Sequence, residues 1–146
     1  MSGLAEILDA VAVKARAVTG IVGASGTGVT AGVDPAPAEL PGTPYAVVYL
    51  GAGTAEQGSL TTYEDGVEIR VYVPASALPR AYAVLCGFPD LFEAAWRTDR
   101  DLGGLVEDSG YEGHGKVERE DWGSISYLTM PIRIGIHRSA GADLST

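Results

Sequence analysis

With 146 residues, of which 46% are hydrophobic and 20% charged, the chain has the composition of an ordinary soluble globular protein and the length of one domain. Ten basic and nineteen acidic residues give a net charge of −9, which argues against a basic face that neutralises nucleic-acid phosphates. No run of about 18 apolar residues occurs and the N-terminal segment lacks a secretory pattern, so we expect neither a membrane span nor a signal peptide.

The first segment has helical periodicity. Its apolar residues recur at three- and four-residue spacing, which predicts a helix over about residues 2–18 with Ser2 as its N-cap. Residues 20–44 are rich in glycine and proline. We expect a loop there, or a weak edge strand over 27–33, followed by an extended stretch.

Two strands follow in the sequence. The apolar run 45–50 is typical of a strand buried on both faces, and the small, polar residues 51–59 predict a turn or flexible loop. Residues 61–73 alternate between apolar and polar side chains, which predicts a strand with one covered face and one wetter face. Pro74 is expected to end that strand.

A second helix is predicted over about residues 78–98. Pro89 lies inside it and is expected to kink or split the helix, because proline removes a backbone hydrogen bond. Cys86, the only cysteine, is expected to be a small buried apolar residue. A single cysteine excludes an intramolecular disulfide and a zinc site made of four cysteines.

The last third of the chain begins with a charged segment. We predict a strand start at Leu105, then a projecting hairpin or loop over 107–122. The apolar alternation of 125–136 predicts a final strand, and Pro131 within it indicates an edge position or a bulge. We expect one small α+β domain over residues 1–138 and a short flexible tail over 139–146.

Two glycine-rich patterns near residue 26 resemble nucleotide-binding motifs. In Gly23–Thr30 the glycine spacing of a phosphate loop is present, but Val29 stands where the phosphate-binding lysine must be. Residues 26–31 also match a loose dinucleotide fingerprint, which requires a strand before it and a helix after it. Here a helix precedes and prolines follow, so we reject both interpretations.

No reaction centre is apparent in the sequence. The two histidines, His114 and His137, lack metal-ligand spacing and are expected at the surface. A nucleophile elbow is also missing. We therefore predict no catalytic residue, cofactor or metal. A carboxylate pair brought together by the fold, from Glu64-Asp65 or Glu120-Asp121, stays open as an alternative.

The charged segment 107–122 is the best candidate for a contact surface. Both signs of charge alternate along it, and Trp122 and Arg119 are residue types that often anchor protein interfaces. A solvated loop is the competing interpretation. The candidate subunit-interface residues are Glu107, Asp108, Lys116, Glu118, Arg119, Glu120, Asp121, Trp122 and Pro131.

The order of these elements carries a family resemblance. It rests on the N-terminal helix, the proline-rich approach to a Val/Tyr strand, the helix ending near Trp96, and four segments. These are Gly66-Val67-Glu68-Ile69-Arg70-Val71-Tyr72-Val73, Asp101-Leu102-Gly103-Gly104-Leu105-Val106, Asp121-Trp122-Gly123-Ser124-Ile125-Ser126-Tyr127-Leu128 and Ile132-Arg133-Ile134-Gly135-Ile136. Over about residues 1–138 the chain resembles tail terminator proteins of long-tailed bacteriophages, also called tail completion or minor tail proteins.

The resemblance implies a fold and a function. The fold is a twisted, mostly antiparallel sheet of about four to five strands, with two main helices packed on one face. The function is structural: a six-membered ring caps the tail tube in the virion, ends its polymerisation and joins the tail to the head–tail connector or head-closure protein. Such a ring assembles in the host bacterial cytoplasm, and DNA passes through it without specific binding.

Two other functions remain open at this point. One is a head-closure or head–tail adaptor protein of the phage neck, which differs in attaching to the portal side instead of the tube end. The other is a small enzyme or ligand-binding domain that uses a carboxylate pair, and this alternative requires a deep pocket with convergent polar groups.

Overall fold

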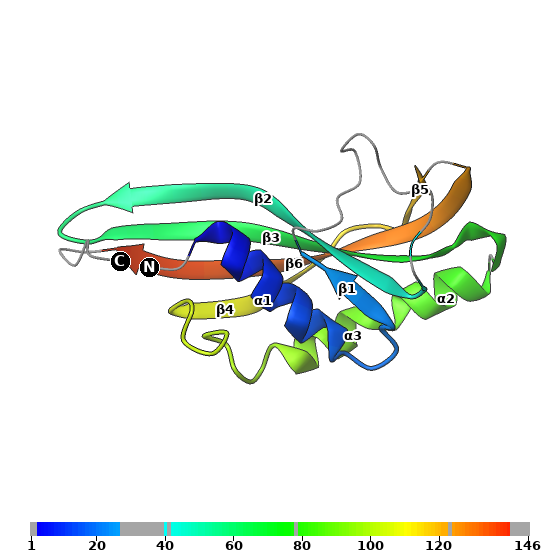
Figure 1. Cartoon of the computed structure of the whole chain (residues 1–146), viewed down its shortest axis with the longest axis horizontal. Helices are drawn as coiled ribbons and strands as arrows, with labels where there is room; N and C mark the ends of the chain where they lie inside the picture. Colours follow the sequence, from blue (N-terminus) through cyan, green and yellow to red (C-terminus); the bar gives the residue numbers. More distant parts are fainter. Residues whose placement is uncertain (1–2, 27–39, 41, 78, 123, 141–146) are drawn as a thin grey trace.

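The computed structural model describes residues 3–26, 40, 42–77, 79–122 and 124–140, which form a single small α+β domain (Figure 1). Three helices, a short 3₁₀ helix and six strands follow one another along the chain. In order they are α1 (Leu4–Arg16), β1 (Gly23–Ser25), β2 (Tyr45–Gln57), β3 (Thr61–Pro74), η1 (Ala75–Ala77), α2 (Arg80–Cys86), α3 (Phe88–Ala95), β4 (Asp108–His114), β5 (Glu118–Trp122) and β6 (Ile125–Ala140).

The six strands form one mixed sheet in the order β1-β2-β3-β6-β4, and β5 pairs with β6 beside β4. Only β1 and β2 are parallel. The centre of the sheet is the antiparallel pair β3–β6, which keeps one register from Thr61 opposite Ala140 to Pro74 opposite Tyr127. The sheet has more strands than predicted because the short β1 and the charged segment both contribute to it.

The helices cover one face of this sheet, as predicted (Figure 1). Apolar side chains at helical spacing on α1, with every second side chain on β3 and β6, fill the core between the two layers. The fully buried side chains of this core include Ile7, Val11, Ile69, Leu85, Phe92, Trp96, Ile132 and Ile134.

The second helical region is split, as the proline predicts. α2 ends at Cys86, and Gly87 separates it from α3. Pro89 lies in the first turn of α3, where a missing backbone N–H breaks no intrahelical hydrogen bond. The predicted cap of the first helix is wrong: Gly3 is the N-cap of α1 without a side-chain hydrogen bond, and Ser2 lies outside the described residues.

The predicted loop over residues 51–59 is wrong. β2 continues to Gln57, opposite Thr61 of β3, so that only residues 58–60 form the turn. The sequence hides this part of the strand because its residues are exposed on both faces. Without a covered face there is no apolar alternation, and backbone pairing with β3 alone defines the strand. The edge strand expected over 27–33 lies outside the described residues.

The charged segment does not project from the domain. Its two strands both pair with β6, so β6 is an interior strand and the predicted edge position of Pro131 is wrong. The predicted bulge at Pro131 is also absent, since β6 keeps its register with β3 there; instead β4 ends opposite Ile132 and β5 begins opposite Thr129, which leaves a break between these two partner strands at Pro131. A proline without an N–H is tolerated at such a break. Gly115 donates its N–H to the Pro131 carbonyl over 2.9 Å.

Two further predictions, the burial of Cys86 and the end of the domain at residue 138, are wrong. Cys86 is exposed, because Leu85 takes the buried position at this turn of α2. β6 runs to Ala140, two residues past the predicted end of the domain, and residues 141–146 of the predicted tail lie outside the described part. Among the described residues no helix is long and apolar enough to cross a membrane.

The split helix offers a test of the core. Leu85 is fully buried between α2 and the sheet, whereas the neighbouring Val84 is 38% exposed. We expect Leu85→Ala to lower the free energy of unfolding by about 2–5 kcal/mol, since it leaves a cavity. Val84→Ala should change it by less than about 0.5 kcal/mol. Urea denaturation of both variants checks this, and equal losses would mean that α2 is not seated on the core.

Candidate functional site

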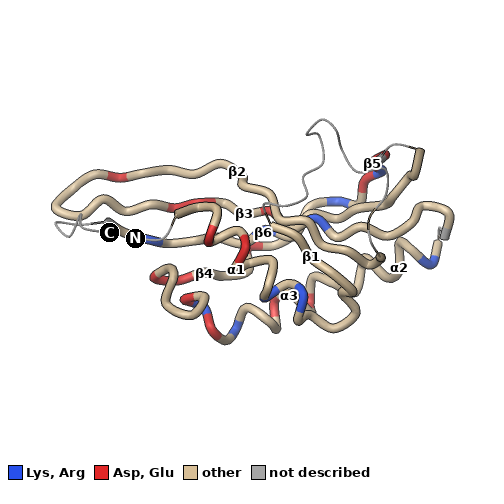
Figure 2. Tube along the Cα trace, in the orientation of Figure 1, with Lys and Arg blue, Asp and Glu red and all other residues tan. Residues whose placement is uncertain are grey.

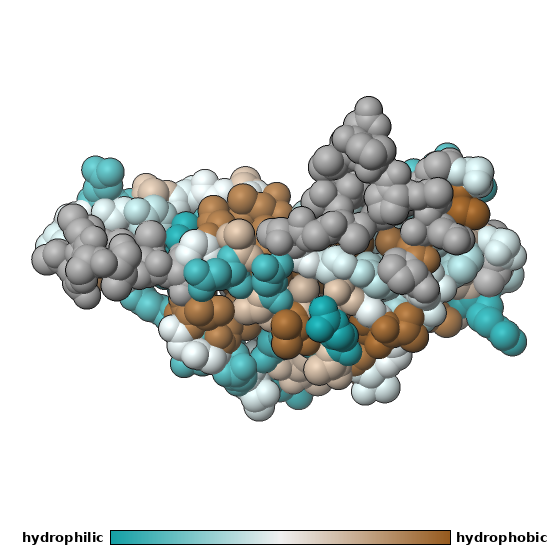
Figure 3. Space-filling view, in the orientation of Figure 1, coloured by the Kyte–Doolittle hydropathy of each residue, from teal (hydrophilic) through white to brown (hydrophobic). Residues whose placement is uncertain are grey.

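The β2–β3 hairpin and the end of β6 form an arm that extends beyond the helices (Figure 1). We define the arm as residues 49–57, 61–66 and 136–140. Residues 50–60 are all exposed, which is unusual for thirteen- and fourteen-residue strands in a small domain. Small and weakly polar residues dominate β2 in the arm, and its uncovered upper part is largely pale in Figure 3.

A buried ion pair holds the base of the arm. Arg138 Nε of β6 lies 2.8 Å from Asp65 Oδ2 of β3, and each side chain is only 10% exposed. The Arg138 guanidinium also lies 4.6 Å from the ring centroid of Tyr63. Opposite Asp65, Gly53 leaves room for the carboxylate, because a Cβ there would lie 2.5 Å from Asp65 Oδ1. The three strands are therefore fixed relative to one another.

The face of the sheet away from the helices, here called the open face, carries a row of ionisable residues where the arm joins the rest of the sheet. Glu64, His137 and Asp108 lie next to one another on β3, β6 and β4. His137 Nδ1 is 3.5 Å from Glu64 Oε1. A shallow hollow of about 230 Å³ lies here over Gly66 and Gly135. Within the described ranges no group of three or more His, Cys, Asp or Glu side chains is placed to hold a metal ion.

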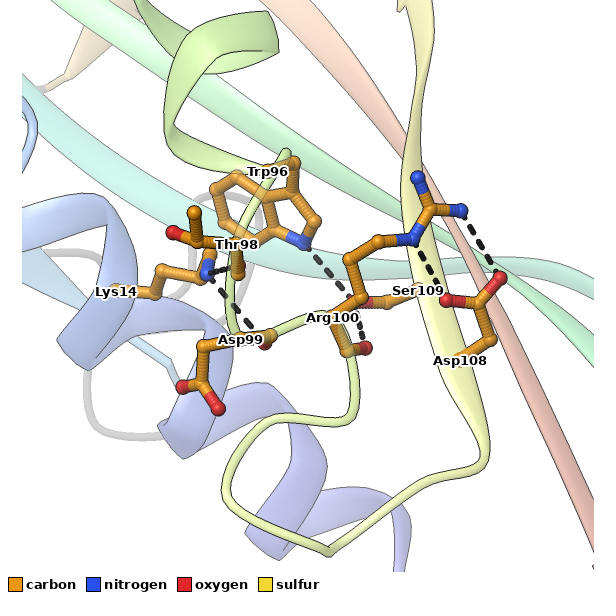
Figure 4. Close-up of polar contacts among 7 residues, drawn as sticks. All are labelled: Lys14, Trp96, Thr98, Asp99, Arg100, Asp108 and Ser109. Atoms are coloured by element: carbon orange, nitrogen blue, oxygen red, sulfur yellow. Dashed lines mark hydrogen bonds and ion pairs between the residues drawn. The ribbon is translucent and has the colours of Figure 1, made fainter.

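The outer side of β4 is tied to the helices by the contacts in Figure 4. Trp96 donates its indole N–H to Ser109 Oγ over 3.1 Å, and Ser109 donates to the Arg100 carbonyl over 2.7 Å. The Arg100 guanidinium then donates two hydrogen bonds of 2.8 and 2.9 Å to Asp108. These bonds lower the pKa of the Asp108 carboxyl below its usual value.

Lys14 joins α1 to the same region. Its ammonium group donates to the Thr98 carbonyl over 2.6 Å and lies 5.1 Å from the Trp96 ring centroid (Figure 4). One buried indole thus receives contacts from α1 on one side and from β4 on the other. The segment between α3 and β4 is consequently fixed to the domain at both of its ends.

Tyrosines and charged residues build a second polar cluster at the other end of the open face. Tyr72 donates to Glu120 Oε2 over 2.5 Å, and its oxygen lies 3.1 Å from that of Tyr49. Arg70 donates to Glu120 over 2.9 Å and to Glu68 over 2.5 Å. Burial and the hydrogen bond to Glu120 raise the pKa of Tyr72 well above its ordinary value, so it stays a protonated donor. Glu120 therefore links β5 to β3 across β6.

A small apolar cluster adjoins these polar groups. It contains Leu40, Tyr45, Val47, Tyr72 and Tyr127. The Leu40 N–H donates to the Tyr127 hydroxyl over 3.0 Å, and the rings of Tyr72 and Tyr127 meet edge to face with centroids 6.0 Å apart. This end of the open face is consequently covered, in contrast with the arm.

Seven of the nine predicted interface residues fall into two groups, and Pro131 and Trp122 stand apart from both. Four acidic residues make contacts inside the chain: Asp108 with Arg100, Glu120 with Arg70 and Tyr72, Glu107 with Ser139, and Asp121 with Ser126. Lys116, Glu118 and Arg119 are exposed, and no ion pair is recorded for them among the described side chains. Pro131 lies at the break between β4 and β5, and the side chain of Trp122 lies outside the description.

The carboxylate pairs considered in the sequence do not converge. Glu64 is exposed on the open face, whereas its neighbour Asp65 is buried on the helix side and bound to Arg138. Glu120 and Asp121 are successive residues of β5 and therefore point to opposite faces. Both histidines lie at the exposed positions predicted for them.

No family model matches the sequence, and no curated protein is significantly similar to it.

Sequence reasoning missed the Asp65–Arg138 pair and the contacts around Tyr72. The paired residues are 73 positions apart in one case and 48 in the other, so no local motif joins them. The register of β3 against β6, which brings Tyr63 opposite Arg138 and Asp65 opposite Ile136, is known only from the structure. An ion at an inward position of a strand is itself a reason to look for a buried partner.

The buried pair can be compared with an exposed one. We expect Arg138→Met to cost about 3–5 kcal/mol of unfolding free energy, because it leaves the Asp65 carboxylate buried without its partner. Arg97→Met breaks a pair whose side chains are 70% and 49% exposed and should cost less than about 1 kcal/mol. Urea denaturation measures both, and the further substitution Asp65→Asn should recover part of the first loss. Similar small losses in the two variants would contradict a buried pair.

Proposed function

We propose that the chain is a structural subunit of a bacteriophage virion, a tail terminator that forms a ring of six copies on the end of the tail tube. The observation that carries the proposal is the arm. Eleven consecutive exposed residues, 50–60, continue an ordered hairpin beyond the helices. Folding of the monomer gains little from this extension, because almost no apolar surface is buried there.

The rest of the domain supports a role that works through surfaces. The sheet is covered by helices on one face and partly by the tyrosine cluster on the other, so its free parts are the arm and the outer sides of the edge strands. Lys116, Glu118 and Arg119 lie on or next to such an edge strand, β5, and are exposed. These are the residues of the predicted contact surface that remain available to another subunit or to the tube protein.

The charge of the chain suits a ring through which DNA passes. Each copy has a net charge of −9, and Figure 2 shows acidic residues along β3, β4 and the segment before β4. A closed ring of such copies repels the DNA backbone from its walls. In this proposal the tail tube protein and the head–tail connector or head-closure protein are the partners, and the virion neck is the location.

Two measurements test the ring. Native mass spectrometry and negative-stain microscopy of the chain, alone and with purified tail tubes, should show a six-fold mass and an annular cap at one end of each tube. Addition of the chain should also stop the growth of tubes from tube protein. A chain that stays monomeric and never binds tube ends would disprove the function, and binding to portal complexes instead would indicate a head-closure or adaptor protein.

Substitution of the two exposed cations of the contact surface, Lys116 and Arg119, tests whether this surface takes part in ring formation. We expect Lys116→Glu/Arg119→Glu to weaken ring formation by about tenfold or more, because charge reversal at an interface introduces repulsion. Its melting temperature should stay within about 2 °C of the parent, as for most exposed substitutions. Arg80→Glu, which reverses an exposed charge on α2, is the control and should assemble normally. A parallel loss of melting temperature and assembly would assign these cations to folding.

A further inference from the structure

The outer edge of β2 is open along most of its length. β1 pairs only with residues 45–47, and beyond Val47 no described strand lies on that side of β2. On an antiparallel strand every second residue points its N–H and C=O away from its partner. A β-bulge interrupts β2 between Leu50 and Gly53, and beyond it the edge from Gly53 to Gln57 presents backbone donors and acceptors in the order that another strand can bind.

Beyond the bulge, this edge lacks the prolines and most of the charges with which proteins usually protect exposed strands. Between Tyr49 and Gln57 it contains no proline, lysine or arginine, and Glu56 is its single charged residue. Small residues fill its centre, and Leu50 beside them is 47% exposed. Natural monomers block such edges with charges, prolines or very short strands. The absence of these features on a strand of this length indicates that the edge is covered in the working state.

The edge is also held in a fixed shape before any partner arrives. β2 pairs with β3 as far as Gln57 opposite Thr61, and β3 pairs with β6 over the same length. The ion pair between Asp65 and Arg138 fixes these strands from the helix side. A preordered edge pays little conformational entropy when a strand is added, which favours pairing over its full length.

The opposite edge of the sheet supplies a matching strand. β5 pairs with β6 on one side, and its other side is unpaired among the described strands. The exposed charges at this edge are the cations Arg119 and, just before the strand, Lys116, together with the acids Glu118 and Asp121, so that they balance. The exposed charges of the arm are instead the acids Glu56 and Glu64, since its arginine, Arg138, is bound to Asp65.

Resting on the proposed ring, we propose that the β2 edge of one copy pairs with the outer edge of β5 in the next copy, so that the sheet continues from subunit to subunit. A head-to-tail contact of this kind uses two different edges and repeats around a closed ring. Charge favours it over a two-fold pairing of β2 with β2, which would gather the acids of two arms. Head-to-tail pairing instead places the acids of one arm beside an edge whose exposed charges balance and include Lys116 and Arg119.

An edge substitution and a matched control test the contact. Ala55 is exposed on the β2 edge, and Ala55→Lys adds a charge of the kind that blocks strand pairing. Thr62→Lys adds the same charge to the same hairpin, but on β3, whose two sides are both paired. We expect Ala55→Lys to weaken association of the full chain by about tenfold or more, and Thr62→Lys by about twofold or less, in analytical ultracentrifugation and native mass spectrometry. Circular dichroism and urea denaturation confirm that both variants remain folded.

Mixing two blocked variants tests the head-to-tail order. Ala55→Lys keeps an intact β5 edge, and Lys116→Glu/Arg119→Glu keeps an intact β2 edge. We expect each variant alone to fail to associate and their mixture to form 1:1 complexes. If the double variant associates like the parent chain while Ala55→Lys does not, the pairing is two-fold through β2 and the inference is wrong.

These experiments distinguish an error in the proposed β2–β5 contact from an error in the proposed tail function. Rings that form normally with Ala55→Lys would overturn the β2 contact and leave the ring in place. Association that Ala55→Lys abolishes, without capping of tail tubes by the parent chain, would keep the edge contact and overturn the tail function. A parent chain that stays monomeric at all concentrations, with and without tubes, would overturn both.

Discussion

The antiparallel pairing of β3 with β6 is the interaction on which the rest of the structure depends. It runs in one register along all of β3, from the tip of the arm to Pro74. Because side chains alternate across a strand, this single register decides which residues meet the helices and which meet the open face. A shift by one residue would expose the apolar row of Ile69 and Ile132 and bury Arg70, so the register is strongly determined.

The two faces are stabilised by different kinds of contact. On the helix side the core consists of aliphatic and aromatic side chains, and its few polar groups are bonded, as the indole of Trp96 is to Ser109. On the open face Tyr72, Arg70 and Glu120 share hydrogen bonds that fix β5 against β3 across β6. Only one buried side-chain atom in the described ranges, Thr129 Oγ1, lacks a partner. Nearly all buried polar side chains of the described domain therefore have hydrogen-bond partners within the chain. The exposed part of the structure begins at the base of the arm.

The sequence was most informative where burial imposes a pattern. Alternation predicted β3 almost to the residue, and Pro89 predicted the split between α2 and α3, because both follow from local physical rules. The outer half of β2 gave no such pattern, since neither of its faces is covered, and β4 and β5 were hidden by the charges of edge strands. The contacts of Asp65 with Arg138 and of Tyr72 with Glu120 depend on pairing between distant strands, which propensity does not encode. The elements of the candidate surface could be located from sequence, but not their pairing.

In the proposed ring, the charge of the chain and the open edge of β2 would act in opposite directions on the association of two copies. Copies with a net charge of −9 repel one another over roughly a Debye length, about 8 Å at physiological ionic strength. Backbone pairing acts only at contact, so an edge without charges would stick to any strand that reached it. The exposed charges of the arm are acids, whereas those at the opposite edge balance, so in the proposed ring the repulsion between two copies is weakest in the head-to-tail orientation. Selection of a partner by local charge, followed by pairing of a preordered edge, gives a specific contact without a large apolar surface on the monomer.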